Sequence, residues 1–112
     1  MLKFEESGLS GSLINAIREI GFQEFTPIQE KVIPIILESR TDIIALAQTG
    51  TGKTAAFALP LIQKTNVDNG HIQSLVLCPT RELCLQIATE TEKYAKYTKG
   101  FSVVAVDRKS VV

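Results

Sequence analysis

The sequence predicts an α/β fold in which a helical segment precedes a parallel sheet with flanking helices. Three short apolar runs alternate with longer segments of helical periodicity, the pattern of strand, helix, strand. The intervening segments are long enough for right-handed crossovers, which favour parallel pairing of the strands. Of the 112 residues, 45% are hydrophobic and 21% are charged, so a single domain with a true core is expected.

The first part of the sequence predicts two helices. In residues 9–22 (LSGSLINAIREIGF), Ser10 can cap a helix whose apolar residues recur at helical spacing, and Gly21 can end it. In residues 25–40 (FTPIQEKVIPIILESR), Thr26 can cap a second helix, and Pro27 suits its first position. Pro34 is expected to kink or tighten this helix because proline removes a backbone donor.

The remainder of the sequence predicts strands that alternate with helices. The expected strands are residues 42–46 (DIIAL), 74–78 (SLVLC) and 101–106 (FSVVAV). A buried helix is expected from Gly52 onward with a bend at Pro60, and a longer helix is expected from Arg81 to Tyr97. Residues 66–70 are expected to form a loop.

Charge and cysteine usage narrow the class of protein. Twelve Lys and Arg balance twelve Asp and Glu, so any nucleic acid would be bound by specific groups rather than by bulk positive charge. Cys78 and Cys84 have no partner Cys or His pair that would complete a metal site, which favours two reduced thiols. No apolar run approaches the roughly 20 residues of a membrane span. We therefore expect a soluble, cytoplasmic protein.

The strongest motif is AQTGTGKT, which lies between an expected strand and an expected helix, as a phosphate-binding loop requires. Small residues let successive amides turn toward phosphate oxygens, and the helix that follows adds the positive end of its dipole. The general pattern begins with Gly, and Ala stands there in this chain. A chance match in an ordinary connection is the alternative. The candidate nucleotide-binding residues are Ala47, Gln48, Thr49, Gly50, Thr51, Gly52, Lys53 and Thr54.

Lys53 and Thr54 are also the candidate catalytic residues. Lys53 would place its charge on the β and γ phosphates of a nucleotide, and the hydroxyl of Thr54 would bind Mg²⁺.

A second motif, GFQEFTPIQ, ends at Gln29 and follows an upstream aromatic, Phe4. The amide of Gln29 carries a donor and an acceptor that match the N6 and N7 edge of adenine, and an aromatic ring could stack on the base. The alternative is a capping box, in which Gln29 returns a hydrogen bond to the start of its own helix at Thr26. Phe4 and Phe22 could equally be core residues.

A third motif, PTRELCLQ, follows the second expected strand. It opens a helix whose free amides, with a nearby arginine, could bind a backbone phosphate of a nucleic acid. Ordinary helix capping with solvated charges is the alternative. The candidate nucleic-acid residues are Pro79, Thr80, Arg81 and Glu82.

The order and spacing of the three motifs resemble those of the DEAD-box RNA helicases, from about Phe4 to about Val106. The resemblance implies a RecA-like ATP-binding fold, with ATP and Mg²⁺ as cofactors and single-stranded RNA as partner. It assigns adenine recognition to Phe4, Phe22 and Gln29, phosphate binding to residues 47–54, and an RNA-backbone contact to the PTREL segment at 79–83.

The resemblance also predicts the organisation of the chain. Residues 1–40 would form a helical adenine-recognition segment, residues 41–106 part of the ATP-binding domain, and residues 107–112 (DRKSVV) an atypical tail. Family members continue into an Asp-Glu-Ala-Asp segment, a Ser-Ala-Thr segment and a second domain, and none of these occurs here. We therefore expect a fragment of an ATP-dependent RNA helicase that does not turn over ATP by itself.

Two other functions are compatible with the same motifs. The first is a phosphate-loop ATPase that acts on DNA or protein, and the second is a nucleotide-binding module without turnover. The PTREL segment and Gln29 argue against the first.

Overall fold

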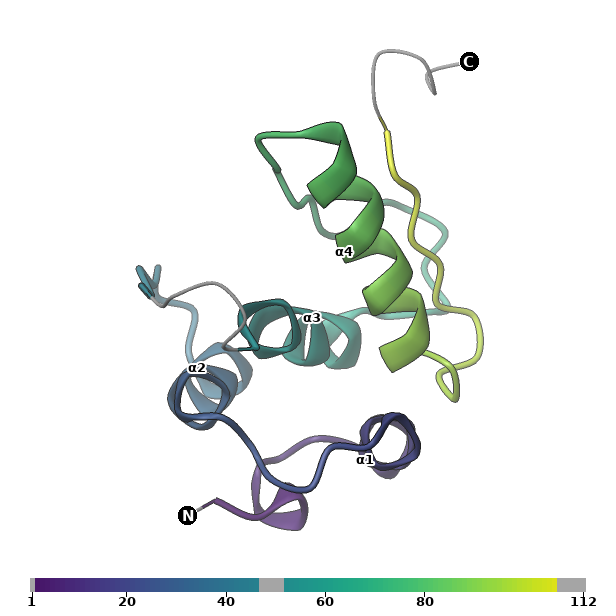
Figure 1. Ribbon diagram of the computed structural model, residues 1–112. Helices are drawn as coiled ribbons and strands as arrows, with labels where there is room; N and C mark the ends of the chain where they lie inside the picture. The colour runs from purple at the N-terminus through teal and green to yellow at the C-terminus, as the bar shows by residue number, and fades with distance from the viewer. Residues whose placement is uncertain (1, 47–51, 107–112) are drawn as a thin grey trace.

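The computed structural model describes residues 2–46 and 52–106, which contain four α-helices and one short 3-10 helix (Figure 1). Helix α3 packs against both α2 and α4, and α1 also contacts α4. The elements are η1 (Phe4–Glu6), α1 (Gly11–Ile20), α2 (Pro27–Glu38), α3 (Lys53–Lys64) and α4 (Arg81–Tyr94).

Helix α1 begins and ends where its sequence predicts. The hydroxyl of Ser10 accepts a hydrogen bond from the backbone N–H of Leu13 at 3.4 Å. Gly21 ends the helix with a φ of 117°, a left-handed conformation that costs glycine little. Leu13, Ile14 and Ile17 are buried on one face, which is the apolar stripe expected of an amphipathic helix.

Helices α2 and α3 each contain an internal proline and continue through it. Pro27 occupies the first position of α2 behind the cap Thr26, as predicted. Pro34 lies inside α2 and Pro60 inside α3, and each helix is a single element of 12 residues. The helix that was expected from Gly52 onward begins at Lys53, because Gly52 is its N-cap.

Helix α4 is shorter than predicted, ending at Tyr94 instead of Tyr97. After Ala95 the backbone changes to tighter hydrogen bonds between residues three apart. Lys96 N–H donates to the carbonyl of Lys93 at 3.3 Å, and Thr98 N–H donates to that of Ala95 at 2.9 Å. The prediction of three further helical residues was therefore wrong.

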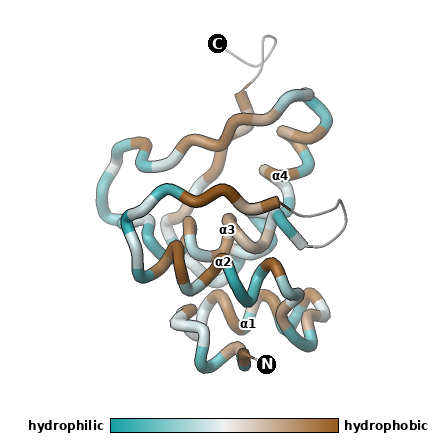
Figure 2. The backbone as a smooth tube through the Cα atoms, turned by 90° about the vertical axis from the view of Figure 1, so that its left-hand side faces the viewer, coloured by the Kyte–Doolittle hydropathy of each residue, from teal (hydrophilic) through white to brown (hydrophobic). Residues whose placement is uncertain are grey.

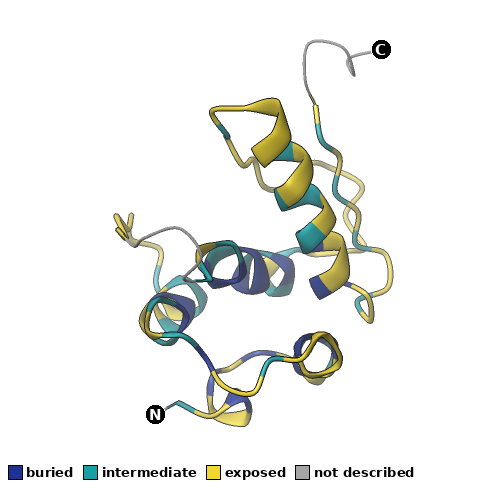
Figure 3. Cartoon of the chain, in the orientation of Figure 1, coloured by how far each residue is buried: buried dark blue, intermediate teal, exposed yellow. Residues whose placement is uncertain are grey.

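The three expected strands are not observed. The described residues contain no β-strand. Apolar side chains along these segments are exposed, including Ile44 at 90%, Leu77 at 85% and Val104 at 78% (Figures 2 and 3). A sheet requires neighbouring strands within about 4.8 Å to complete the hydrogen-bond ladder. The structure thus shows the helical layer of the predicted α/β fold without the parallel sheet.

One hydrophobic core joins the helices. It combines side chains from before residue 40 with side chains from α3 and α4, so all four helices contribute. Burial of each large apolar side chain stabilises the fold by about 1.5–3 kcal/mol. The core includes Phe4, Leu13, Ile17, Phe25, Ile33, Ala55, Leu59, Ile62 and Tyr94. The predicted functional division at residue 40 stays a prediction.

Across residues 2–46 and 52–106, no helix combines the length and the apolar character needed to cross a bilayer.

Candidate functional site

Gly52 is the first described residue of the candidate nucleotide site. Its φ is 86°, and a Cβ at this position would lie 2.3 Å from Nε2 of Gln29. Both the left-handed backbone and this close approach favour glycine. The other predicted loop residues, Ala47, Gln48, Thr49, Gly50 and Thr51, lie outside the described residues.

Gln29 connects the second motif to the phosphate-binding motif. Its side chain is 1% exposed, and its Nε2 donates to the carbonyl oxygen of Gly52 at 3.2 Å. Its Oε1 accepts from the backbone N–H of Thr26 at 3.0 Å, and its own N–H approaches the hydroxyl of Thr26 at 3.5 Å. The predicted capping box is therefore confirmed.

The capping box does not exhaust the hydrogen-bonding capacity of Gln29. A side-chain amide has two N–H donors and two lone pairs on its oxygen. The contacts with Gly52 and Thr26 use one donor and one lone pair. One donor and one acceptor are left, which is the pair that an adenine edge requires. Recognition of adenine by Gln29 stays a prediction.

Lys53 and Thr54 occupy the first turn of α3. Lys53 is exposed and Thr54 is half-buried. Among the described residues, no side chain caps the N-terminus of α3. The amides of this first turn, the helix dipole and the Lys53 ammonium together favour an anion, which fits the triphosphate of a nucleotide.

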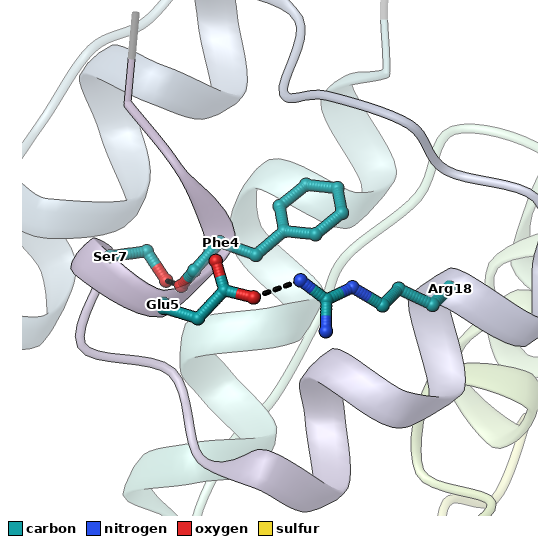
Figure 4. Close-up of polar contacts among 4 residues, drawn as sticks. All are labelled: Phe4, Glu5, Ser7 and Arg18. Atoms are coloured by element: carbon teal, nitrogen blue, oxygen red, sulfur yellow. Dashed lines mark hydrogen bonds and ion pairs between the residues drawn. The ribbon is translucent and has the colours of Figure 1, made fainter.

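Phe4 lies in the core. It is 6% exposed and packs edge-to-face on Phe25, with ring centroids 4.7 Å apart and an interplanar angle of 71°. The guanidinium carbon of Arg18 lies 5.6 Å from the centroid of the Phe4 ring, and Arg18 also pairs with Glu5 (Figure 4). A hydrogen bond from the backbone N–H of Glu5, followed by the hydrogen bond from Arg18, lowers the pKa of Glu5. Stacking of Phe4 on a base stays a prediction.

Phe22 follows the end of α1 and contacts α4. It is half-buried and packs edge-to-face on Tyr94, with ring centroids 6.1 Å apart. Burial raises the pKa of Tyr94 to about 12, and the nearby carboxylate of Glu90 adds to this effect. The structure thus places Phe22 against α4, and its predicted role in adenine recognition is untested.

The third motif forms the first turn of α4. Thr80 caps the helix, accepting a hydrogen bond from the N–H of Leu83 at 3.2 Å. Pro79, Thr80, Arg81 and Glu82 are all exposed. Only the opposite end of α4 is buried, at Thr91 and Tyr94 (Figure 3). The predicted cap is confirmed, and the nucleic-acid contact stays a prediction.

The candidate metal ligand and the thiols show no assembled metal site. Within the described part of the chain, no group of three or more His, Cys, Asp or Glu side chains could hold a metal ion. Binding of Mg²⁺ by Thr54 stays a prediction. Cys78 and Cys84 are free. Desolvation, with a smaller contribution from Cys84, raises the pKa of Cys78, which favours its neutral thiol.

Two polar connections were missed by the sequence analysis. Glu19 on α1 accepts from Lys96 and Tyr97 beyond the end of α4. Gln63 on α3 bonds to the backbone of Gly8 and Ser10. Both connections join residues more than 50 positions apart, and no local sequence pattern predicts such pairs.

Comparison with known proteins identifies relatives over most of the chain. Over 95 residues, the chain is 50% identical to the ATP-dependent RNA helicase CshA of Limosilactobacillus reuteri. This match covers 85% of the present chain and 19% of the relative. It resembles the crystal structure of a DEAD box protein from Methanococcus jannaschii with a TM-score of 0.80 and 49% identity, over 84% of this chain and 26% of that one.

A structure of Saccharomyces cerevisiae Dbp5 bound to RNA and ADP BeF3 is also similar, with a TM-score of 0.83 and 37% identity. This match covers 87% of the present chain and 25% of Dbp5. The chain spans about a fifth of the length of the curated relatives it matches. Residues 26–111 match the DEAD/DEAH box helicase family. The chain therefore belongs to the DEAD/DEAH box helicase family.

Proposed function

We propose that this chain forms the nucleotide-binding start of an ATP-dependent RNA helicase. The observation that carries the proposal is the hydrogen bond between Gln29 and Gly52. It connects Gln29, which is expected to recognise adenine, to the first described residue of the phosphate-binding motif. An adenine and the phosphates attached to it can therefore be held by one hydrogen-bonded unit.

The residues of this unit have separate roles in the proposal. Gln29 offers its remaining donor and acceptor to the adenine edge. Lys53 and the first-turn amides of α3 would stabilise the phosphate charge, and the Thr54 hydroxyl would hold Mg²⁺. ATP would supply the γ-phosphoryl group, whose transfer to water releases ADP and drives remodelling, and Mg²⁺ would neutralise charge on the phosphates. Acidic and arginine residues beyond this chain would complete the hydrolytic site, as the resemblance implies.

RNA binding is proposed at the first turn of α4. Pro79–Glu82 are exposed there, and the similar Dbp5 structure is described as bound to RNA. Backbone phosphates of single-stranded RNA would meet the start of the helix beside Arg81. In the complete protein we propose that residues 42–46, 74–78 and 101–106 pair into the parallel sheet, which would cover their exposed apolar side chains.

Substitution of the two lysines at opposite ends of α3 tests this function. In the complete protein, Lys53→Ala should reduce RNA-stimulated ATP hydrolysis at least about a hundredfold, because it removes charge from the β and γ phosphates. Lys64→Ala, at the other end of the helix, should hydrolyse ATP normally. Stimulation by DNA rather than RNA, or normal turnover by Lys53→Ala, would refute the proposal.

A further inference from the structure

Gln63 holds the loop before α1 through both ends of its side-chain amide. It lies at the C-terminal end of α3, one residue before Lys64. Its Oε1 accepts from the backbone N–H of Ser10 at 2.6 Å, and its Nε2 donates to the carbonyl oxygen of Gly8 at 2.5 Å. Such paired contacts fix both the position and the orientation of a backbone segment.

The loop that Gln63 holds is hydrogen-bonded directly to Phe4. The hydroxyl of Ser7 donates to the carbonyl oxygen of Phe4 at 2.6 Å (Figure 4). The same hydroxyl accepts from the N–H of Leu9 at 3.2 Å. Ser7 is 5% exposed, so water competes little for these bonds. The backbone of Phe4 and the loop around Gly8 are therefore linked to each other through the Ser7 hydroxyl.

Helix α3 is thus connected to two of the three residues that are expected to recognise adenine, Gln29 and Phe4. At its N-terminal end, the Gly52 carbonyl accepts from Gln29. At its C-terminal end, Gln63 holds the segment that carries Phe4. The 12 residues of α3 extend about 18 Å, at 1.5 Å per residue, and form a rigid spacer between the two connections.

We propose that Gln63 is a positioning residue for adenine recognition. It touches no nucleotide and acts by fixing the Phe4 segment relative to the phosphate-binding end of α3. The inference rests on the proposed function, since it requires that Phe4 and Gln29 read the base. Loss of Gln63 should therefore weaken the preference for ATP over GTP and leave phosphate binding intact.

The test compares ligands with and without a base in the full-length protein. Gln63→Leu keeps the approximate size of the side chain and removes both hydrogen bonds. It should weaken ATP binding about fivefold and lower the ATP over GTP preference by a similar factor. Binding of inorganic tripolyphosphate, which has no base, should be unchanged. The matched control is Lys64→Met, which removes the hydrogen bond from Lys64 to the Ile36 carbonyl and should leave all three affinities unchanged.

Several outcomes would overturn the proposal. They are equal losses of ATP and tripolyphosphate binding, unchanged affinities in Gln63→Leu, or the same loss in Lys64→Met. If Gln63→Leu fails to fold, Gln63→Glu replaces it, because a carboxylate still accepts from Ser10 N–H and loses only the donor to Gly8. Its ATP over GTP preference should fall about twofold, and an unchanged preference would refute the role. Equal ATP and GTP affinities in the unmodified protein would instead refute the proposed function itself.

Discussion

The side-chain amide of Gln29 donates to the backbone carbonyl of Gly52 at 3.2 Å, and the two residues lie 23 positions apart in the sequence. Gln29 is almost fully buried, and the same side chain closes the capping box of α2. Gln29 thus closes the cap of α2 and also contacts the phosphate-binding motif, while one donor and one acceptor of its amide remain unused by these contacts.

Gln29→Glu should weaken ATP binding by about one to two powers of ten in the complete protein. The carboxylate lacks the donor for adenine N7, and an unsatisfied group in a partly buried pocket costs roughly 1–3 kcal/mol. The preference for ATP over GTP should shrink. Because the carboxylate also faces the Gly52 carbonyl, the melting temperature should fall as well. Titration with fluorescent nucleotides and thermal unfolding measure the two effects.

Thr26→Ala is the control for the capping role of Gln29. It removes the hydroxyl that caps α2 and should cost about 0.5–2 kcal/mol of stability. It leaves the Gln29 side chain in place, so the ATP over GTP preference should persist. If Gln29→Glu lost stability but kept its preference, Gln29 would be a cap only.

Gly52→Ala should destabilise the fold and impair nucleotide binding. The left-handed backbone alone costs an alanine roughly 1–2 kcal/mol, and the new Cβ would collide with the Gln29 amide. The double variant Gly52→Ala with Gln29→Ala should lose less stability than the sum of the two single losses. The reason is that the collision is gone, while the backbone strain persists. Chemical denaturation of the four proteins of this cycle measures the coupling.

Gly11→Ala is the matched glycine control. A Cβ at Gly11 meets nothing within 4 Å, and the residue is the first of α1. Alanine should therefore be neutral or slightly stabilising there. Equal destabilisation by Gly11→Ala and Gly52→Ala would show that the close approach of Gln29 is unimportant.

Glu19 should make stability depend on pH at the acidic end. Hydrogen bonds from Lys96 and then Tyr97 lower the pKa of Glu19 from its usual 4.5. A carboxyl whose pKa is lowered by folding contributes stability above its unfolded pKa and loses it as the pH falls through the folded pKa. The melting temperature should therefore drop below about pH 4.5, and this drop should be smaller in Glu19→Gln.

The cluster of Glu19, Lys96 and Tyr97 should also make stability fall at high pH. Glu19 raises the pKa of Lys96 above its usual 10.5. The contribution of that ammonium is therefore fully present below this pH and is lost as the pH rises through the raised pKa of the folded protein. Thermal unfolding followed by circular dichroism from about pH 3 to about pH 11 measures the loss of stability at the acidic and at the basic end. Glu24→Gln, at another exposed carboxylate, is the control. Identical pH profiles for Glu19→Gln and the unmodified protein would show that the cluster contributes nothing.

Leu77→Lys should have opposite effects in the isolated chain and in the complete protein. Leu77 is 85% exposed in an apolar segment, which invites aggregation. A lysine there should raise the concentration at which the isolated chain begins to scatter light. In the complete protein, where this segment is proposed to be a sheet strand, it should lower stability. Arg40→Lys, at an exposed site before the first apolar segment, should change neither property.

Local chemistry determined the helices. Ser10, Thr26 and Thr80 cap the helices that their positions predict, and Gly21 ends α1 in a left-handed turn. These features depend on residues within one or two turns, so the sequence alone carries them. The end of α4 was misplaced because Lys96 and Tyr97 leave the helix to meet Glu19, a residue on another element.

Relations between distant residues were decided only by the tertiary structure. Apolar runs such as 74–78 have strand composition, but a strand also needs a paired neighbour, and composition does not supply one. Nor does the sequence of a motif show that Phe4 packs on Phe25 or that Gln29 contacts Gly52. By itself the sequence determined the helix caps, the phosphate-binding motif and the family resemblance. Packing decided which side chains meet, because long-range contacts depend on the geometry of the whole core.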